Sequence, residues 1–99
     1  MNYYFLSYDR HNDEVDSEQL RRSLITTFLE AGCILDSNEE TAIFINTSQS
    51  IEEIASLLTG YNDHMFYTLI VTQEKGYIYK NIEHQENFKS LVDEIYNKI

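Results

Sequence analysis

Residues that could do chemistry gather in one short stretch near the N-terminus, NYYFLSYDRHNDEVD. An apolar aromatic segment runs directly into Asp9, Arg10 and His11, with Ser7 just before them and further acids after them. These side chains could form the edge of an active site that uses metal or acid–base chemistry. The alternative is a polar turn, because Asp at the end of a strand commonly starts turns. The residues alone leave both interpretations open.

Familiar metal and catalytic motifs do not account for this stretch. The run Asp9-x-His11-x-Asp13 resembles the start of an EF-hand loop, but Glu14 occupies the position that requires glycine. The three histidines and the single cysteine lack the spacing of a zinc site. The sequence also has no glycine-rich phosphate loop and no supported Ser/His/Asp or Cys/His arrangement.

The net charge limits which ligands the chain can bind loosely. The 99 residues contain 17 acids and 7 bases, which gives a formal net charge of -10. Because non-specific nucleic-acid binding depends on Lys and Arg beside phosphates, this balance disfavours it. A nucleic-acid ligand would have to be held locally, through metal ions or a small basic spot. The charge also has a simpler explanation, since it keeps a small protein soluble.

Length and composition favour one globular domain over residues 1–99. Hydrophobic residues make up 42% of the chain and aromatic residues 13%. No basic leader segment begins the sequence, and no apolar run approaches the roughly eighteen residues that a membrane span needs. We therefore expect a soluble cytoplasmic protein without a membrane segment. The single cysteine, Cys33, cannot form an internal disulfide and is expected to be a small buried hydrophobic residue.

The order of predicted elements is strand, helix, strand, strand, helix, strand, followed by a short strand and a third helix. Helix start signals come from Asp16 or Ser17 and from a capping box at Ser50 and Glu53, and stop signals come from Gly32 and Gly60. Turns are predicted at 36–40 and 73–76, and a C-terminal helix that includes 88–99. The predicted strands are 3–8, 33–35, 41–46, 65–72 and 77–80.

This order predicts an α+β fold, a ferredoxin-like split β-α-β sandwich (βαββαβ) with an extra C-terminal short strand and helix. The first and third strands would lie side by side in the middle of the sheet, with both crossover helices on one face. Beneath those helices the predicted core residues are Tyr4, Leu6, Ile43, Ile45, Leu69 and Val71.

The opposite face of the predicted sheet is too aromatic to be left in water. This face could be covered by a second copy of the chain, by the C-terminal helix or by stacked RNA bases. Base stacking needs basic residues nearby, and this face has almost none. The residues expected there are Tyr3, Phe5, Ser7, Phe44, Asn46, Phe66, Thr68 and Ile70.

The segment YFLSYD, the helix after it, the hairpin, INTSQSIEEI and the long strand at 65–72 together resemble a known group. The chain is similar in element order to small ferredoxin-like endoribonucleases: the CRISPR-associated adaptation nuclease subunit, the SinR-like proteins, the GhoS-type antitoxins and the structurally related VapD-type ribonucleases. The resemblance implies a metal-dependent endoribonuclease that acts on RNA as a homodimer, in a toxin–antitoxin or CRISPR-related context.

The same resemblance implies roles for the residues at the end of the first strand. Asp9 matches the proposed metal ligand of the CRISPR-associated members, which pairs with its dimer mate across a two-fold axis. A divalent cation, Mg²⁺ or Mn²⁺, between two such carboxylates could bind a scissile phosphate and lower the pKa of an attacking water. Ser7 is expected to hydrogen-bond nearby, Arg10 to engage phosphate oxygens and His11 to act as a base.

A second hypothesis gives the chain no catalytic activity. The acidic balance departs from the basic surface of the nucleic-acid-binding members, and it suits a protein that binds or inhibits a basic, nucleic-acid-binding partner. A third possibility is a degenerate member kept only for assembly. The only adjacent basic pair, Arg21 and Arg22, is expected on an exposed helix face, paired with Glu18 or nearby acids.

Overall fold

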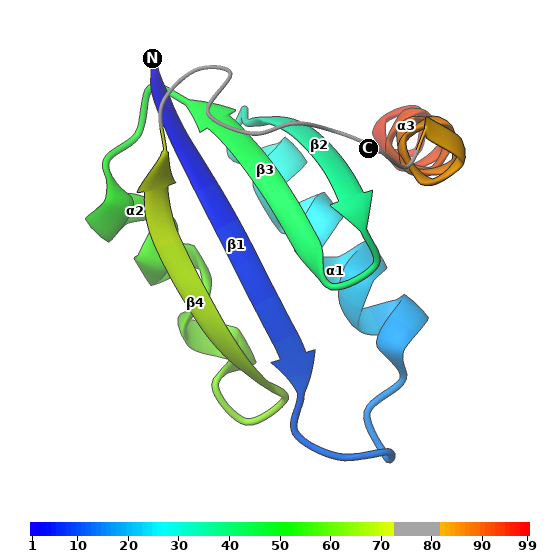
Figure 1. Cartoon of the computed structure of the whole chain (residues 1–99). Helices are drawn as coiled ribbons and strands as arrows, with labels where there is room; N and C mark the ends of the chain where they lie inside the picture. The colour runs from blue at the N-terminus through cyan, green and yellow to red at the C-terminus, as the bar shows by residue number, and fades with distance from the viewer. Residues whose placement is uncertain (73–81) are drawn as a thin grey trace.

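The computed structural model describes residues 1–72 and 82–99, which form an α+β fold around one antiparallel sheet (Figure 1). The four strands lie in the order β2-β3-β1-β4. The first and third strands are therefore central, as predicted. The predicted turn at 73–76 and strand at 77–80 lie outside the described residues. The strands are β1 (Asn2–Arg10), β2 (Ile34–Glu39), β3 (Ala42–Thr47) and β4 (Met65–Thr72).

Two helices cover one face of the sheet, and local signals in the sequence set where they begin (Figure 1). Helix α1 (Ser17–Glu30) is capped by the Asp16 side chain, which accepts a hydrogen bond from the Gln19 main chain at 3.0 Å. Helix α2 (Ile51–Leu57) has the predicted capping box at Ser50. The helix ends at Leu57, a few residues before the predicted end at Gly60, and a 3₁₀ turn, η1 (Thr59–Tyr61), follows it.

The core lies between these helices and the sheet. Tyr4, Leu6, Ile43 and Ile45 are buried as predicted, and Leu69 is partly buried against them. The prediction for Val71 was wrong, since 66% of this residue is exposed. Val71 shares the helix-facing side with its neighbour Tyr4, but it lies near the end of β4, which is an edge strand of the sheet. Cys33 is buried, as expected.

The third helix, α3 (Ile82–Tyr96), packs against β2 and α1 at the edge of the sheet rather than over its open side (Figure 1). Its Phe88 and Ile95 are buried in the core, whereas Tyr96 and Ile99, which were expected on the same stripe, are exposed. Of the three covers proposed for the open side, the C-terminal helix is therefore not the one seen among the described residues. Within the described residues, no helix has the length and apolar character needed to cross a membrane.

The hairpin between β2 and β3 is tighter than predicted. The expected turn at 36–40 is largely strand, and only residues 40–41 form the turn. The fully buried Ser37 explains the difference, because its hydroxyl lies 2.6 Å from the carbonyl oxygens of both Glu39 and Ala42. These contacts accompany a register irregularity between Asp36 and Glu39, which lets a polar segment continue as strand.

Candidate functional site

The alternation of side chains along β1 divides the predicted site residues between two faces. Ser7 and Asp9 lie on the side opposite the helices and are exposed, whereas Tyr8 and Arg10 lie on the helix side. Asp9 is inside the strand and pairs with Phe66 of β4. It therefore does not start the turn. That role belongs to Asn12, whose side chain accepts a hydrogen bond from the Glu14 main chain at 2.9 Å.

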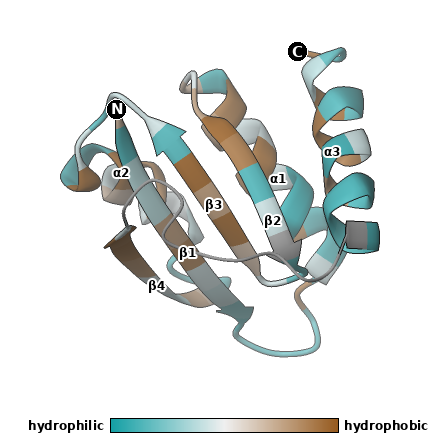
Figure 2. Cartoon of the chain, turned by 45° about the horizontal axis from the view of Figure 1, so that its top comes forward, coloured by the Kyte–Doolittle hydropathy of each residue, from teal (hydrophilic) through white to brown (hydrophobic). Residues whose placement is uncertain are grey.

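We call the side of the sheet without helices the open face. The ribbons of β3 and β4 are coloured largely as hydrophobic (Figure 2). Phe66 is 65% exposed and Ile70 47%, while the rings of Phe5 and Phe44 contact each other with centroids 4.9 Å apart. None of its defining residues is a lysine or arginine. The strand register defines the open face as Tyr3, Phe5, Ser7, Asp9, Phe44, Asn46, Phe66, Thr68 and Ile70.

His11 reaches the same neighbourhood from just beyond β1. Its ring centroid lies 4.2 Å from that of Phe66, and its main-chain N–H donates to the His64 carbonyl at 2.9 Å. Because Phe66 is the cross-strand neighbour of Asp9, the imidazole and the carboxylate both lie beside one aromatic ring. The structure thus brings Ser7, Asp9 and His11 to one region of the open face.

Arg10 does not join that group. Its Nη1 donates to the Val15 carbonyl at 3.0 Å, and its Nη2 lies 3.4 Å from the Asp13 carboxylate. These contacts hold the guanidinium on the helix side of β1 and fasten the loop before α1. Within one chain, the side chains of Arg10 and Asp9 therefore lie on opposite faces of the sheet.

The described part of the chain has no group of three or more His, Cys, Asp and Glu side chains arranged to hold a metal ion. Asp9 alone supplies too few ligands for Mg²⁺ or Mn²⁺ within one chain, since these ions prefer several oxygen ligands. A metal ion at Asp9 would take its other ligands from water, from substrate oxygens or from the carboxylate of a second copy.

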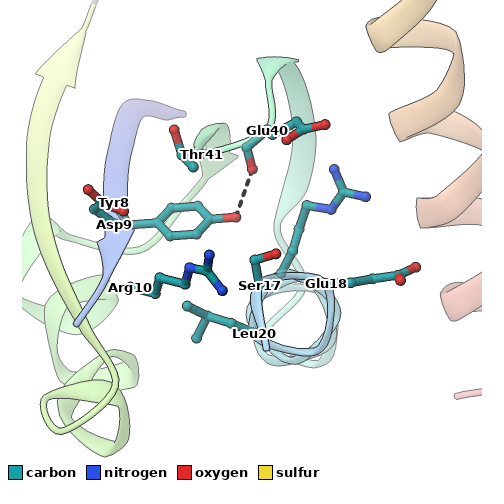
Figure 3. Close-up of a pocket in the computed structure, with 9 residues that line it drawn as sticks. Tyr8, Asp9, Arg10, Ser17, Glu18, Leu20, Glu40 and Thr41 are labelled. Carbon is teal, nitrogen blue, oxygen red and sulfur yellow. Dashed lines mark hydrogen bonds between the residues drawn. The ribbon is translucent and has the colours of Figure 1, made fainter. Parts of the chain in front are cut away.

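On the helix side of β1 the structure forms a cavity of about 370 Å³ between the end of β1, the start of α1 and the β2–β3 turn (Figure 3). The Tyr8 hydroxyl donates to the Glu40 carbonyl at 3.0 Å. Burial raises the pKa of Tyr8 to about 12, with nearby Arg21 opposing that rise. The cavity is lined by Tyr8, Asp9, Arg10, Ser17, Glu18, Leu20, Arg21, Glu40 and Thr41.

The two arginines of the adjacent pair have different environments. Arg22 pairs as expected, with Nε 3.5 Å from Glu18 and Nη2 3.3 Å from Glu94. The prediction was wrong for Arg21, which lines the cavity and whose Nε is buried with no hydrogen-bond partner among the described residues. Helical spacing carried a signal for this, since Arg21 precedes the fully buried Ile25 and Phe28 by four and seven positions.

No protein-family model, no curated protein and no solved structure matches this chain.

Proposed function

We propose that the chain is a ferredoxin-like endoribonuclease that acts as a homodimer, with Asp9 binding the divalent metal ion at the dimer interface. The observation that carries this proposal is the position of Asp9, exposed on the open face beside Phe66 and in line with Ser7. The strand order β2-β3-β1-β4, with α1 and α2 on one face, supports the ferredoxin-like arrangement.

The chemistry follows from two copies meeting through their open faces. Two Asp9 carboxylates close to each other would repel, and a Mg²⁺ or Mn²⁺ ion between them removes that repulsion. When bound, the ion would supply Lewis-acid chemistry at a phosphate. Ser7 is placed to hydrogen-bond on the same face, and the His11 imidazole, held against Phe66, is placed to accept a proton.

The acidic composition supports a second candidate, a non-catalytic protein that engages a basic nucleic-acid-binding partner. The formal net charge is -10, and the open face as defined contains no lysine or arginine to hold RNA. Such binding would weaken steeply with salt, since it would depend on opposite charges at the rim of an interface.

The first prediction concerns Asp9→Asn, which removes the metal-binding charge and keeps the side-chain shape. We expect the wild-type protein to cut a pool of labelled RNAs with Mg²⁺ or Mn²⁺ and not with EDTA. We expect Asp9→Asn to lower the cleavage rate at least about a hundredfold, because one essential metal ligand is lost. The measurement is single-turnover cleavage resolved on denaturing gels.

The matched control is Asp93→Asn, the same change at an exposed position of α3 away from the open face. It should cut RNA like the wild type. Absence of metal-dependent cutting, or equal cutting by Asp9→Asn, would overturn the nuclease proposal. The acidic binding protein would then be tested by salt-dependent capture of a basic nucleic-acid-binding protein.

A further inference from the structure

Arg21 is a partly buried arginine that forms no ion pair with any of the described residues. The other two described arginines form ion pairs, Arg10 with Asp13 and Arg22 with Glu18 and Glu94. Among the described residues none forms an ion pair with Arg21 or accepts a hydrogen bond from its buried Nε. A buried N–H donor without an acceptor is costly, and the Nε–H of Arg21 is such a donor. Such a group indicates a missing anionic partner.

The cavity beside Arg21 adds further donors. Arg10 lines the same cavity, and its contacts with Val15 and Asp13 leave other guanidinium N–H groups free to bond. Ser17 contributes a hydroxyl from the first residue of α1 (Figure 3). The first main-chain N–H groups of a helix lack intrahelical partners, and Asp16 accepts only that of Gln19. The start of α1 therefore also favours an anion here.

Three acidic residues also line the cavity, namely Asp9, Glu18 and Glu40. Glu18 is paired with Arg22, and its side chain extends away from the Tyr8 ring (Figure 3). Glu40 contributes the carbonyl that accepts the Tyr8 hydrogen bond, and its side chain is exposed. The Asp9 side chain belongs to the opposite face of β1. Two guanidinium groups, those of Arg10 and Arg21, therefore line this cavity on a protein of negative net charge.

We propose that this cavity is a binding site for a phosphate group, held by the guanidinium groups of Arg21 and Arg10 with Ser17 at the start of α1. Arginine forks match phosphate oxygens in pairs, which is why phosphate is the anion class chosen. The cavity is large enough for one phosphate with its attached group, at about 370 Å³. The Asp9 side chain lies on the other side of β1, and the phosphate site stands whether or not the chain cuts RNA.

The test is a titration of ¹⁵N-labelled protein with sodium phosphate at constant ionic strength, followed by amide and arginine Nε–H signals. We expect saturable shifts centred on Ser17, Glu18 and Arg21. Arg21→Gln should weaken binding at least about tenfold, because it removes a charge-assisted pair of hydrogen bonds. Arg22→Gln is the matched control, since it removes the same charge one residue away, and it should bind phosphate like the wild type.

Two additional arms complete the experiment. If Arg21→Gln fails to fold, Thr41→Asp places a negative charge in the same cavity wall and should abolish binding. Titrations with adenosine 5′-monophosphate and with a short RNA compare a free phosphate ester with a nucleic-acid backbone. The probe that binds more tightly identifies the source of the phosphate. Absence of saturable shifts, or equal weakening by Arg21→Gln and Arg22→Gln, would overturn the site. The phosphate titration measures binding without a divalent metal ion, so its outcome is separate from that of the cleavage assay.

Discussion

At the scale of single residues, the buried hydroxyl of Tyr8 makes the fold sensitive to alkaline pH. Its pKa is raised from 10.0 to about 12, mainly by burial. Between pH 10 and pH 12 the unfolded chain has released this proton and the folded chain has kept it. The contribution to stability is therefore complete below pH 10 and is lost as the pH rises through 12.

The corresponding prediction compares the wild type with Tyr8→Phe. We expect the variant to be about 1 kcal/mol less stable at pH 7, because the hydrogen bond to the Glu40 carbonyl is lost. Between pH 10 and pH 12 the wild type should lose up to about 1.4 kcal/mol per pH unit more than the variant. Urea unfolding across this range measures both effects. Parallel curves for the two proteins would contradict the assignment.

The sequence predicts on which face of the sheet a residue lies better than it predicts which residue of another strand it pairs with. Two-residue alternation places Ser7 and Asp9 together once β1 is recognised, and it equally separates them from Arg10. The extent of β1 was underestimated, since it continues through Asp9 to Arg10 by pairing with β4. Pairing of that kind depends on residues more than fifty positions away, and a local pattern does not contain it. The position of Arg21 in the cavity has the same origin, because the cavity forms only when β1, α1 and the β2–β3 turn meet.

At the scale of elements, the start of α2 depends on a reciprocal pair of hydrogen bonds. The Ser50 hydroxyl accepts from the Glu53 main chain at 3.1 Å, and the Glu53 carboxylate accepts from the Ser50 main chain at 3.0 Å. This start anchors Ile54, which is fully buried. The cap therefore supports both the helix and its contact with the core.

We expect Ser50→Ala to lower the free energy of unfolding by about 1 kcal/mol, the usual cost of losing a helix N-cap. Ser56→Ala is the control, because Ser56 is exposed in the same helix and caps nothing at its start. It should change stability by less than about 0.5 kcal/mol. Chemical denaturation of the three proteins measures the difference, and equal effects would show that the capping box adds nothing.

Element types follow from sequence where the signals are local. The capping box, the Asp16 cap and the glycine after α1 act within a few residues, and Gly32 has the positive φ of 81° that favours glycine. The β2–β3 turn was misplaced because the Ser37 hydroxyl bonds carbonyl groups across the hairpin. Polar side chains that would ordinarily indicate a turn are here part of a bulged strand.

At the scale of the whole molecule, the open face presents an apolar surface suited to a second copy. Phe66 and Ile70 are exposed on it, and adjacent Val71 of the same strand points to the opposite side. Exposed apolar patches of this kind usually mark interaction surfaces. The proposed homodimer would bury the patch and bring the two Asp9 side chains together.

The prediction for assembly uses neighbouring positions of one strand. We expect the wild-type chain to sediment as a dimer, Ile70→Asp to sediment as a monomer with the same circular dichroism, and Val71→Asp to remain dimeric. The added charge is the same in both variants, so only the face of β4 differs. A monomeric wild type, or dissociation of both variants alike, would contradict association through the open face.

The central place of β1 also has a consequence for the newly made chain. Tyr3 pairs with Asn46 on one side and with Thr72 on the other, so β1 is synthesised before both of the strands that pair with it. At ordinary translation rates the interval between Arg10 and Thr72 is about 3 to 12 seconds. During that time the aromatic segment YYFLSY emerges without its neighbours, and it has the composition that favours intermolecular strand association. Association of incomplete chains on the ribosome is therefore expected to be the main hazard in producing this protein.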